Sequence, residues 1–293
     1  MSQFRSILNL VRPVQLLLAL LSYGLGLGLA HYLGVTFLPE PQFLGGLIVL
    51  MLLVASALLT EYFRPFNEPI LLGETRKERE DLRSQILIIS VSFLAVSGIL
   101  VFLLQSGGFL VSATAVFLVL FILLALAVAI PPFRLANRGL GELSLSILVV
   151  SFPATLAFLF QFGNLHRLLT IFTFPLFLLA LAYFLILNFP AYADDLKYER
   201  RSLLVSLSWQ RAVPLHNGLL VIAFLFLAAI PFFGVPFGLV WPSLLTLPLA
   251  AYQIFALRNL SEGAKPIWSV FMLIGTALIG LTTYLIVLTF WLR

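Results

Sequence analysis

Residues 168–189 read LLTIFTFPLFLLALAYFLILNF, a run of 22 residues that contains no charged side chain. A helix of about 20 mostly apolar residues is long enough to cross the roughly 30 Å hydrocarbon core of a membrane. The run therefore predicts a transmembrane helix.

Runs of the same kind recur along the whole chain. Apolar residues (AVILMFWYC) make up 61% of the sequence and charged residues only 10%, whereas an ordinary soluble domain carries about 25% charged residues. So few charges do not cover a soluble surface. The sequence predicts an all-α, polytopic membrane protein with nine transmembrane helices. We place them near residues 14–34, 42–62, 85–105, 110–130, 143–162, 168–189, 216–234, 237–257 and 268–290.

The Lys and Arg residues fall unevenly on the two sides of the predicted spans. With the N-terminus in the cytoplasm, fifteen of the 17 lie on the inner side, and only Arg167 and Arg293 lie outside. Cytoplasmic loops of membrane proteins carry such an excess. We therefore expect a cytoplasmic N-terminus, an external C-terminus and a location in the plasma membrane. These loops account for the net charge of +5, so nucleic acid is not an expected partner.

The acidic residues form two clusters at predicted cytoplasmic helix ends. Six of the twelve lie between Glu61 and Asp81, and the second cluster contains Asp194, Asp195 and Glu199. The clusters are four spans apart. This spacing suggests one domain, residues 1–293, built from two pseudo-repeated four-helix halves, roughly 1–140 and 141–260, and a ninth helix.

Spacing within the clusters suggests how the carboxylates meet. Glu61 and Glu68 are seven residues apart, which places them on one helix face with Arg64 between them. Asp195 and Glu199 form an i, i+4 pair. Carboxylates from two helix ends can hold Mg²⁺, which prefers oxygen ligands and substrate phosphates. The alternative is a set of solvated helix ends with internal ion pairs.

The mixed charges of residues 74–83 favour a different structure. Acidic and basic side chains alternate along this run. Such a pattern is typical of a short amphipathic helix on the surface.

Three short segments resemble the UbiA-type intramembrane aromatic prenyltransferases. Residues 131–143, PPFRLANRGLGEL, resemble the PP-x-L-x-Y-R-G-L-G-E segment of this family, especially of its dihydroxynaphthoate (menaquinone-branch) enzymes. Arg12-Pro13 resembles the RP pair that opens the family's first helix. Residues 200–203, RRSL, resemble the G-K-R-T-L string after the second motif. The resemblance covers essentially the whole chain. It implies nine helices and two Asp-rich motifs that bind Mg²⁺ and the diphosphate of a prenyl donor.

Both motifs depart from the family's pattern. At the polar positions of the first motif, NDxxDxxxD, this chain has Thr60, Glu61, Arg64 and Glu68. In the second motif Asn188 and Asp195 are kept, but Ala191 replaces the first Asp. Arg64 is not a ligand for Mg²⁺. As a cation it can pair with phosphate oxygens directly.

The resemblance implies roles for individual residues. The catalytic acids are Glu61, Glu68 and Asp195. The ligands of Mg²⁺ are Glu61, Glu68, Asp194, Asp195 and Glu199. The residues that bind the diphosphate are Arg12, Arg64, Arg138, Asn188, Lys197, Arg200 and Arg201.

The implied activity is Mg²⁺-dependent transfer of a prenyl group from a prenyl diphosphate to an aromatic or lipid acceptor, in quinone-type biosynthesis. The substituted motif acids favour an alternative, a catalytically impaired relative that binds a lipid or a membrane-protein partner. A transporter is the third reading. An odd number of spans and the absence of charged residues at mid-membrane depth argue against it.

Overall fold

The computed structural model describes residues 3–71 and 74–293. This part of the chain is helical and forms no β-strand; an isolated parallel bridge joins Arg138 and Arg201. The elements in chain order are α1 (Gln3–Leu10), α2 (Pro13–Tyr32), α3 (Pro39–Tyr62), α4 (Arg76–Ser106), α5 (Ser112–Ala129), η1 (Leu135–Asn137), α6 (Gly141–Ser146), the π-helical η2 (Ile147–Ser151), α7 (Phe152–Phe162), α8 (Arg167–Leu187), α9 (Tyr192–Lys197), α10 (Leu203–Leu207), α11 (Trp209–Ala229), η3 (Ile230–Phe233), η4 (Phe237–Leu239), α12 (Trp241–Leu244), α13 (Leu247–Ser261) and α14 (Trp268–Trp291). The prediction of an all-α protein is confirmed.

Eight helical segments of the described chain are long and apolar enough to span a membrane. They correspond to the first seven predicted spans and to the ninth. The predicted span at 237–257 is divided among η4, α12 and α13. Pro242 and Pro248 lie in the first turns of α12 and α13, where the missing N–H costs no hydrogen bond. A continuous helix across this region would place proline in its interior, so the chain starts a new helix at each one.

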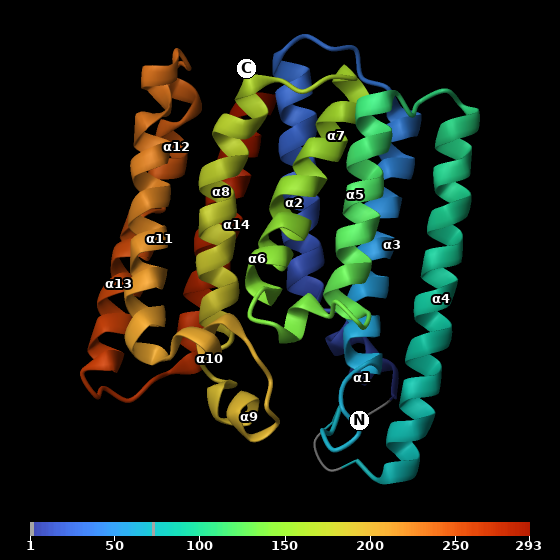
Figure 1. Cartoon of the computed structure of the whole chain (residues 1–293). Coiled ribbons are helices and arrows are strands. Elements are labelled where there is room, and N and C mark those ends of the chain that lie inside the picture. The colour runs from blue at the N-terminus through green and yellow to red at the C-terminus, as the bar shows by residue number, and fades with distance from the viewer. Residues whose placement is uncertain (1–2, 72–73) are drawn as a thin grey trace.

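The elements are arranged with their long axes side by side (Figure 1). The N-terminus, α1, α9 and α10 lie at one end of the bundle, which we call the α9 end. The connection from α2 to α3 and the C-terminus lie at the opposite end. Segments α12 and α13 follow one another beside α11 in the same view.

Close packing holds α2 in the middle of the bundle, where it contacts α7 and α14. A side chain at Gly26 would collide with the carbonyl oxygen of Ala154 in α7. Small residues let membrane helices approach to backbone contact. Gly26 therefore serves the packing of α2 against α7.

Helix α4 turns apolar side chains outward. Ile88, Val91, Ile99 and Phe102 are all exposed. A row of exposed aliphatic and aromatic side chains along one long helix is the surface that lipid solvates.

Residues 74–83 do not form a separate surface helix, so that prediction was wrong. Thr75 caps the start of α4, its side chain and that of Glu78 forming a reciprocal capping box. The helix then continues for 31 residues. At 1.5 Å per residue it is about 46 Å long, longer than the roughly 30 Å hydrocarbon core. The charged turns are the part of α4 that projects beyond the membrane.

Candidate functional site

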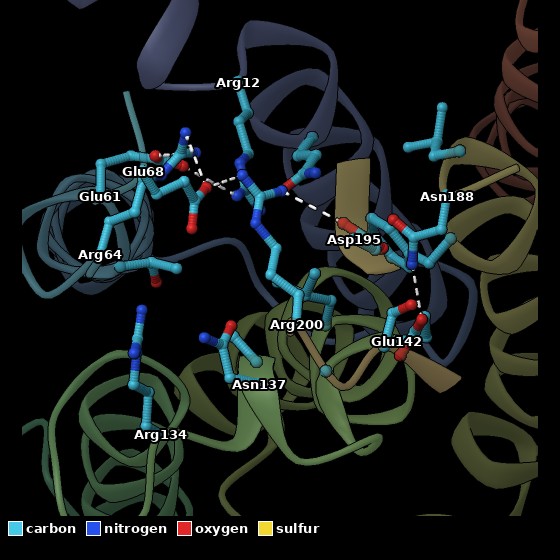
Figure 2. A pocket seen from close by; sticks show the side chains of 18 residues that line it. Arg12, Glu61, Arg64, Glu68, Arg134, Asn137, Glu142, Asn188, Asp195 and Arg200 are labelled. Carbon is cyan, nitrogen blue, oxygen red and sulfur yellow. Dashed lines mark hydrogen bonds and ion pairs between the residues drawn. The ribbon is translucent and has the colours of Figure 1, made fainter. Parts of the chain in front are cut away.

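A cavity of about 270 Å³ lies at the α9 end of the bundle. Its size is near the lower end of the roughly 300–1,000 Å³ range of small-molecule sites. The lining comes from the ends of α2, α3 and α8, from the loop after α3, from the segment around η1 and α6, and from α9 and the loop that follows it. Its charged side chains are four arginines and four carboxylates, shown in Figure 2: Arg12, Arg64, Arg134, Arg200, Glu61, Glu68, Glu142 and Asp195.

Arg64 joins the two acids of the first cluster. It pairs with Glu61, and its Nη1 lies 3.2 Å from Oε1 of Glu68. Nη2 of Arg12, at the start of α2, lies 3.3 Å from the other oxygen of Glu61. This arrangement is the internal ion pairing that the alternative reading of the cluster predicted.

Arg200 continues the chain of charges across the cavity. It pairs with Glu68, and its Nη1 lies 3.3 Å from Oδ1 of Asp195. Burial lowers the pKa of Arg200 to about 10, which leaves the guanidinium charged at neutral pH. The resulting sequence of alternating charges, which we call the ion-pair ladder, is Arg12, Glu61, Arg64, Glu68, Arg200 and Asp195.

The local structure of the first cluster differs from the predicted one. Glu61 lies in the last turn of α3, which ends at Tyr62, and Glu68 lies in the following loop. The two acids therefore do not share a helix face. The cause is Pro65, which has no backbone N–H and disfavours a helical conformation of the residue before it.

The loop after α3 is fixed by a side chain of α4. Nη2 of Arg83 donates hydrogen bonds to the carbonyl oxygens of Arg64 and Pro65, at 2.6 and 3.0 Å. Nη1 of Arg64 donates to the carbonyl oxygen of Pro69 at 2.9 Å. Arg83 therefore positions the backbone that carries Arg64, although it does not line the cavity.

Only one acid of the second cluster faces the cavity. Asp195 is buried in α9, and burial raises the pKa of its carboxyl group. Asp194 is exposed and does not line the cavity. Glu199 lies beyond the end of α9, with a left-handed φ of 54°, and lines another pocket. The expected pairing of Asp195 with Glu199 was wrong because α9 ends at Lys197.

Glu142 is a cavity residue that the sequence-based site did not include. Its Oε1 accepts hydrogen bonds from Nδ2 of Asn188, at 2.5 Å, and from the backbone N–H of Leu203, at 2.9 Å. It is only 3% exposed. The GLGE string of residues 139–142 was the available signal. Asn188, expected to bind diphosphate, lines the cavity while its amide is bonded to Glu142.

Arg134 was also missed, and it differs from the other cavity arginines. No carboxylate of the described residues lies within ion-pair distance of it (Figure 2). With the Asn137 amide oxygen turned toward it, that oxygen accepts from Nη1 and Nη2 at 3.2 and 3.1 Å. Arg134 and Arg12 both have positive φ, 40° and 58°. Such conformations are uncommon for residues other than glycine and cluster at functional sites.

The remaining predicted diphosphate ligands lie elsewhere. Arg138, Lys197 and Arg201 line a second pocket of about 500 Å³ together with Glu199. All four side chains are exposed. Of the predicted anion-binding residues, the structure brings Arg12, Arg64, Asn188 and Arg200 to the cavity.

The donor set does not fit the magnesium site that the resemblance implies. Within residues 3–71 and 74–293 there is no group of three or more Asp, Glu, His or Cys side chains that could hold a metal ion. Glu61, Glu68 and Asp195 are each paired with arginine instead. Ala191 supplies no ligand at its motif position. The chemistry of this cavity is that of guanidinium groups held by carboxylates.

Fold and site together define an integral membrane protein with an arginine-rich cavity at one end of a helical bundle. The sequence of residues 83–276 matches the profile of the UbiA prenyltransferase family. The chain belongs to this family. The matched range begins after the first acid cluster, which is the part that departs most from the family's motif.

Solved structures of UbiA homologs share the fold. A homolog from Archaeoglobus fulgidus, bound to GPP and Mg²⁺, is 17% identical and superposes with a TM-score of 0.60 over 96% of this chain and 99% of its own. A digeranylgeranylglyceryl phosphate synthase is 12% identical, with a TM-score of 0.56 over 100% and 98%. A homolog from Aeropyrum pernix K1 is 13% identical, with a TM-score of 0.51 over 100% and 98%. The search of curated proteins found no match.

Proposed function

We propose that the cavity binds the diphosphate of a prenyl diphosphate and that the protein transfers the prenyl group to an aromatic or lipid acceptor. The observation that carries the proposal is the convergence of Arg12, Arg64, Arg134 and Arg200 on one cavity at the end of the bundle. Guanidinium groups bind phosphate oxygens through charge-assisted, often bidentate hydrogen bonds. The same family includes the Archaeoglobus fulgidus homologs that bind GPP and DMAPP.

The reaction needs stabilisation of a leaving diphosphate. The bond between C1 of the prenyl chain and the diphosphate oxygen breaks, and its electron pair stays on that oxygen. Fixed arginine N–H groups stabilise this developing charge, because they are oriented before the reaction begins. An electron pair of the acceptor forms the new bond to C1, and the acceptor then loses a proton to water or diphosphate.

The prenyl chain extends from the cavity into the bundle. Leu145, Phe184 and Leu187 form the apolar part of the lining. A narrow pocket of about 20 Å³, lined largely by apolar side chains, adjoins it and shares Arg12 and Leu145 with it. A prenyl chain is much larger than this pocket, so binding must separate the surrounding helices. The ring of Phe184 can face the allylic cation that forms on ionisation.

The proposed topology has nine crossings, with η4, α12 and α13 together forming the eighth. Two observations support it. The N- and C-termini lie at opposite ends of the bundle in Figure 1. The loops at the α9 end carry the excess of Lys and Arg, as cytoplasmic loops do. The cavity is then on the cytoplasmic side of the plasma membrane.

The resemblance of residues 131–143 supports an acceptor of the quinone-forming type. Arg134, Asn137 and Glu142 of this segment line the cavity. We therefore favour a bicyclic or monocyclic aromatic acid such as dihydroxynaphthoate as the acceptor.

The test is release of diphosphate from a labelled prenyl diphosphate by the purified protein in lipid. The acceptors are dihydroxynaphthoate, hydroxybenzoate and homogentisate, each with and without Mg²⁺. We expect release coupled to one acceptor, and loss of release in Arg200→Gln. The matched control is Arg76→Gln, because the side chain of Arg76 is 92% exposed and pairs with the exposed Glu80 outside the cavity.

The catalytically impaired relative is the second candidate. The observations that favour it are the pairing of every ladder carboxylate with arginine and the alanine at position 191. In this case the folded protein binds the prenyl diphosphate, but no acceptor elicits diphosphate release.

A further inference from the structure

We infer that the ion-pair ladder takes the place of a divalent cation, so that the protein binds the donor's diphosphate directly through arginine and without Mg²⁺. The inference rests on the proposed function, because it concerns how the same cavity holds the same donor. It differs from the magnesium requirement that the resemblance implies.

The first argument is that the carboxylates of the ladder are already neutralised by arginine. Its three arginines alternate with its three carboxylates, so its formal charge is zero. The side chains of Glu61 and Glu68 are only 5% and 1% exposed. A divalent cation that bound these acids would have to displace arginine from a buried pair. It would also lie beside the displaced guanidinium, which repels it.

The second argument is the number of unused donors. A guanidinium has five N–H groups. Arg12 uses only Nη2 in the ladder, and its Nε and Nη1 form no ion pair with any residue that the structure describes. Arg134 has no carboxylate partner in the described part of the chain, and its buried Nε has no hydrogen-bond acceptor there. The diphosphate can therefore bind arginine without first breaking the ladder.

The third argument is orientation. Arg64 is held between Glu61 and Glu68, and Arg200 is held between Glu68 and Asp195. Both guanidiniums are fixed before the ligand arrives, so little side-chain entropy is lost on binding. Metal ions supply fixed positive charge in other phosphate sites. Here the carboxylates keep the arginines in place.

The experiment measures binding of GPP to the full chain in lipid nanodiscs, in EDTA and in Mg²⁺. We expect affinities that agree within about threefold, a difference of less than about 0.7 kcal/mol. Inorganic diphosphate serves as the competitor and should displace GPP in both buffers, because the arginines recognise the head group.

Arg134→Gln tests whether the guanidinium of Arg134, which has no carboxylate partner among the described residues, binds the diphosphate. Loss of a charged hydrogen bond to phosphate should weaken GPP binding about tenfold in both buffers. Arg134 lies outside the ladder, so this variant leaves the ion pairs intact.

Arg64→Asp tests the replacement of metal by arginine. It removes the central cation and adds a carboxylate between Glu61 and Glu68. We expect binding in EDTA to fall by about tenfold or more and to recover with Mg²⁺. Arg76→Asp makes the same charge change at an exposed position and should bind as the wild type does in both buffers.

The outcomes separate the inference from the proposed function. Binding of GPP by the wild type only with Mg²⁺ overturns the inference and leaves the proposed function standing. No binding in either buffer, with a thermal melt that shows folded protein, overturns the proposed function itself. If Arg64→Asp does not fold, the wild-type comparison and Arg134→Gln still decide between these outcomes.

Discussion

At the residue scale, the buried carboxylates of the cavity have two kinds of partner. Glu61, Glu68 and Asp195 face arginines, whereas Glu142 accepts hydrogen bonds from an amide and a backbone N–H. Glu142 thereby ties the start of α6 to the end of α8 and the start of α10. Its role is to position the wall of the cavity.

Two substitutions of Glu142 should separate hydrogen bonding from charge. Glu142→Ala leaves the Asn188 amide and the Leu203 N–H without their acceptor, and should lower the free energy of unfolding by about 2–3 kcal/mol. Glu142→Gln keeps an acceptor oxygen and should cost less than about 1 kcal/mol. Thermal unfolding in detergent provides the measurement. Equal losses of stability in the two variants would contradict the assigned role.

At the element scale, α4 does more than cross the membrane. Its charged N-terminal turns precede the apolar segment and bring Arg83 to the loop that carries Arg64 and Glu68. The two helices therefore act together. The end of α3 at Tyr62 leaves the following residues in a loop, and Arg83 of α4 holds that loop in place.

Arg83→Met should test this coupling. The substitution keeps an unbranched side chain and removes the donors to two carbonyl oxygens. It should lower the free energy of unfolding by about 2 kcal/mol and weaken GPP binding, because Arg64 loses its fixed backbone. Arg76→Met, in the first turn of the same helix, is exposed and should change stability by less than about 0.5 kcal/mol. Unchanged GPP affinity in Arg83→Met would show that the loop holds its shape without this contact.

At the scale of the whole molecule, the arrangement of helices places the loop after α3 and helix α9, which carry residues of the two acid clusters, at one end of the bundle (Figure 1). The two pseudo-repeated halves remain a prediction. The number of crossings depends on residues 237–261, which are divided among η4, α12 and α13 rather than forming one helix.

Cysteine labelling can test the proposed topology, because the chain contains no cysteine. Single substitutions at exposed positions are Asn164→Cys in the loop before α8, Lys77→Cys in α4 and Glu262→Cys after α13. In intact cells an impermeant thiol reagent should label only Asn164→Cys. Lys77→Cys and Glu262→Cys should react only after the membrane is opened. Labelling of Glu262→Cys in intact cells would mean that residues 237–261 do not cross.

The sequence by itself determined the class of fold and the short segments that resemble the family's motifs. Long apolar runs with few charges permit only a helical membrane protein, since a helix satisfies its own backbone hydrogen bonds in lipid. The short segments around positions 12, 131–143 and 200 pointed to the family. These features depend on local composition and spacing, which are visible in the chain.

Only the tertiary structure decided which charges are partners. Arg200 and Glu68 are far apart in the chain, as are Arg12 and Glu61, and no local pattern indicates that they pair. The same holds for Arg83, which looked like part of a solvated charged run. The separation of Asp195 from Glu199 followed from where α9 ends. Ion pairing depends on distances of a few ångströms between separate elements, and these distances exist only after the helices pack.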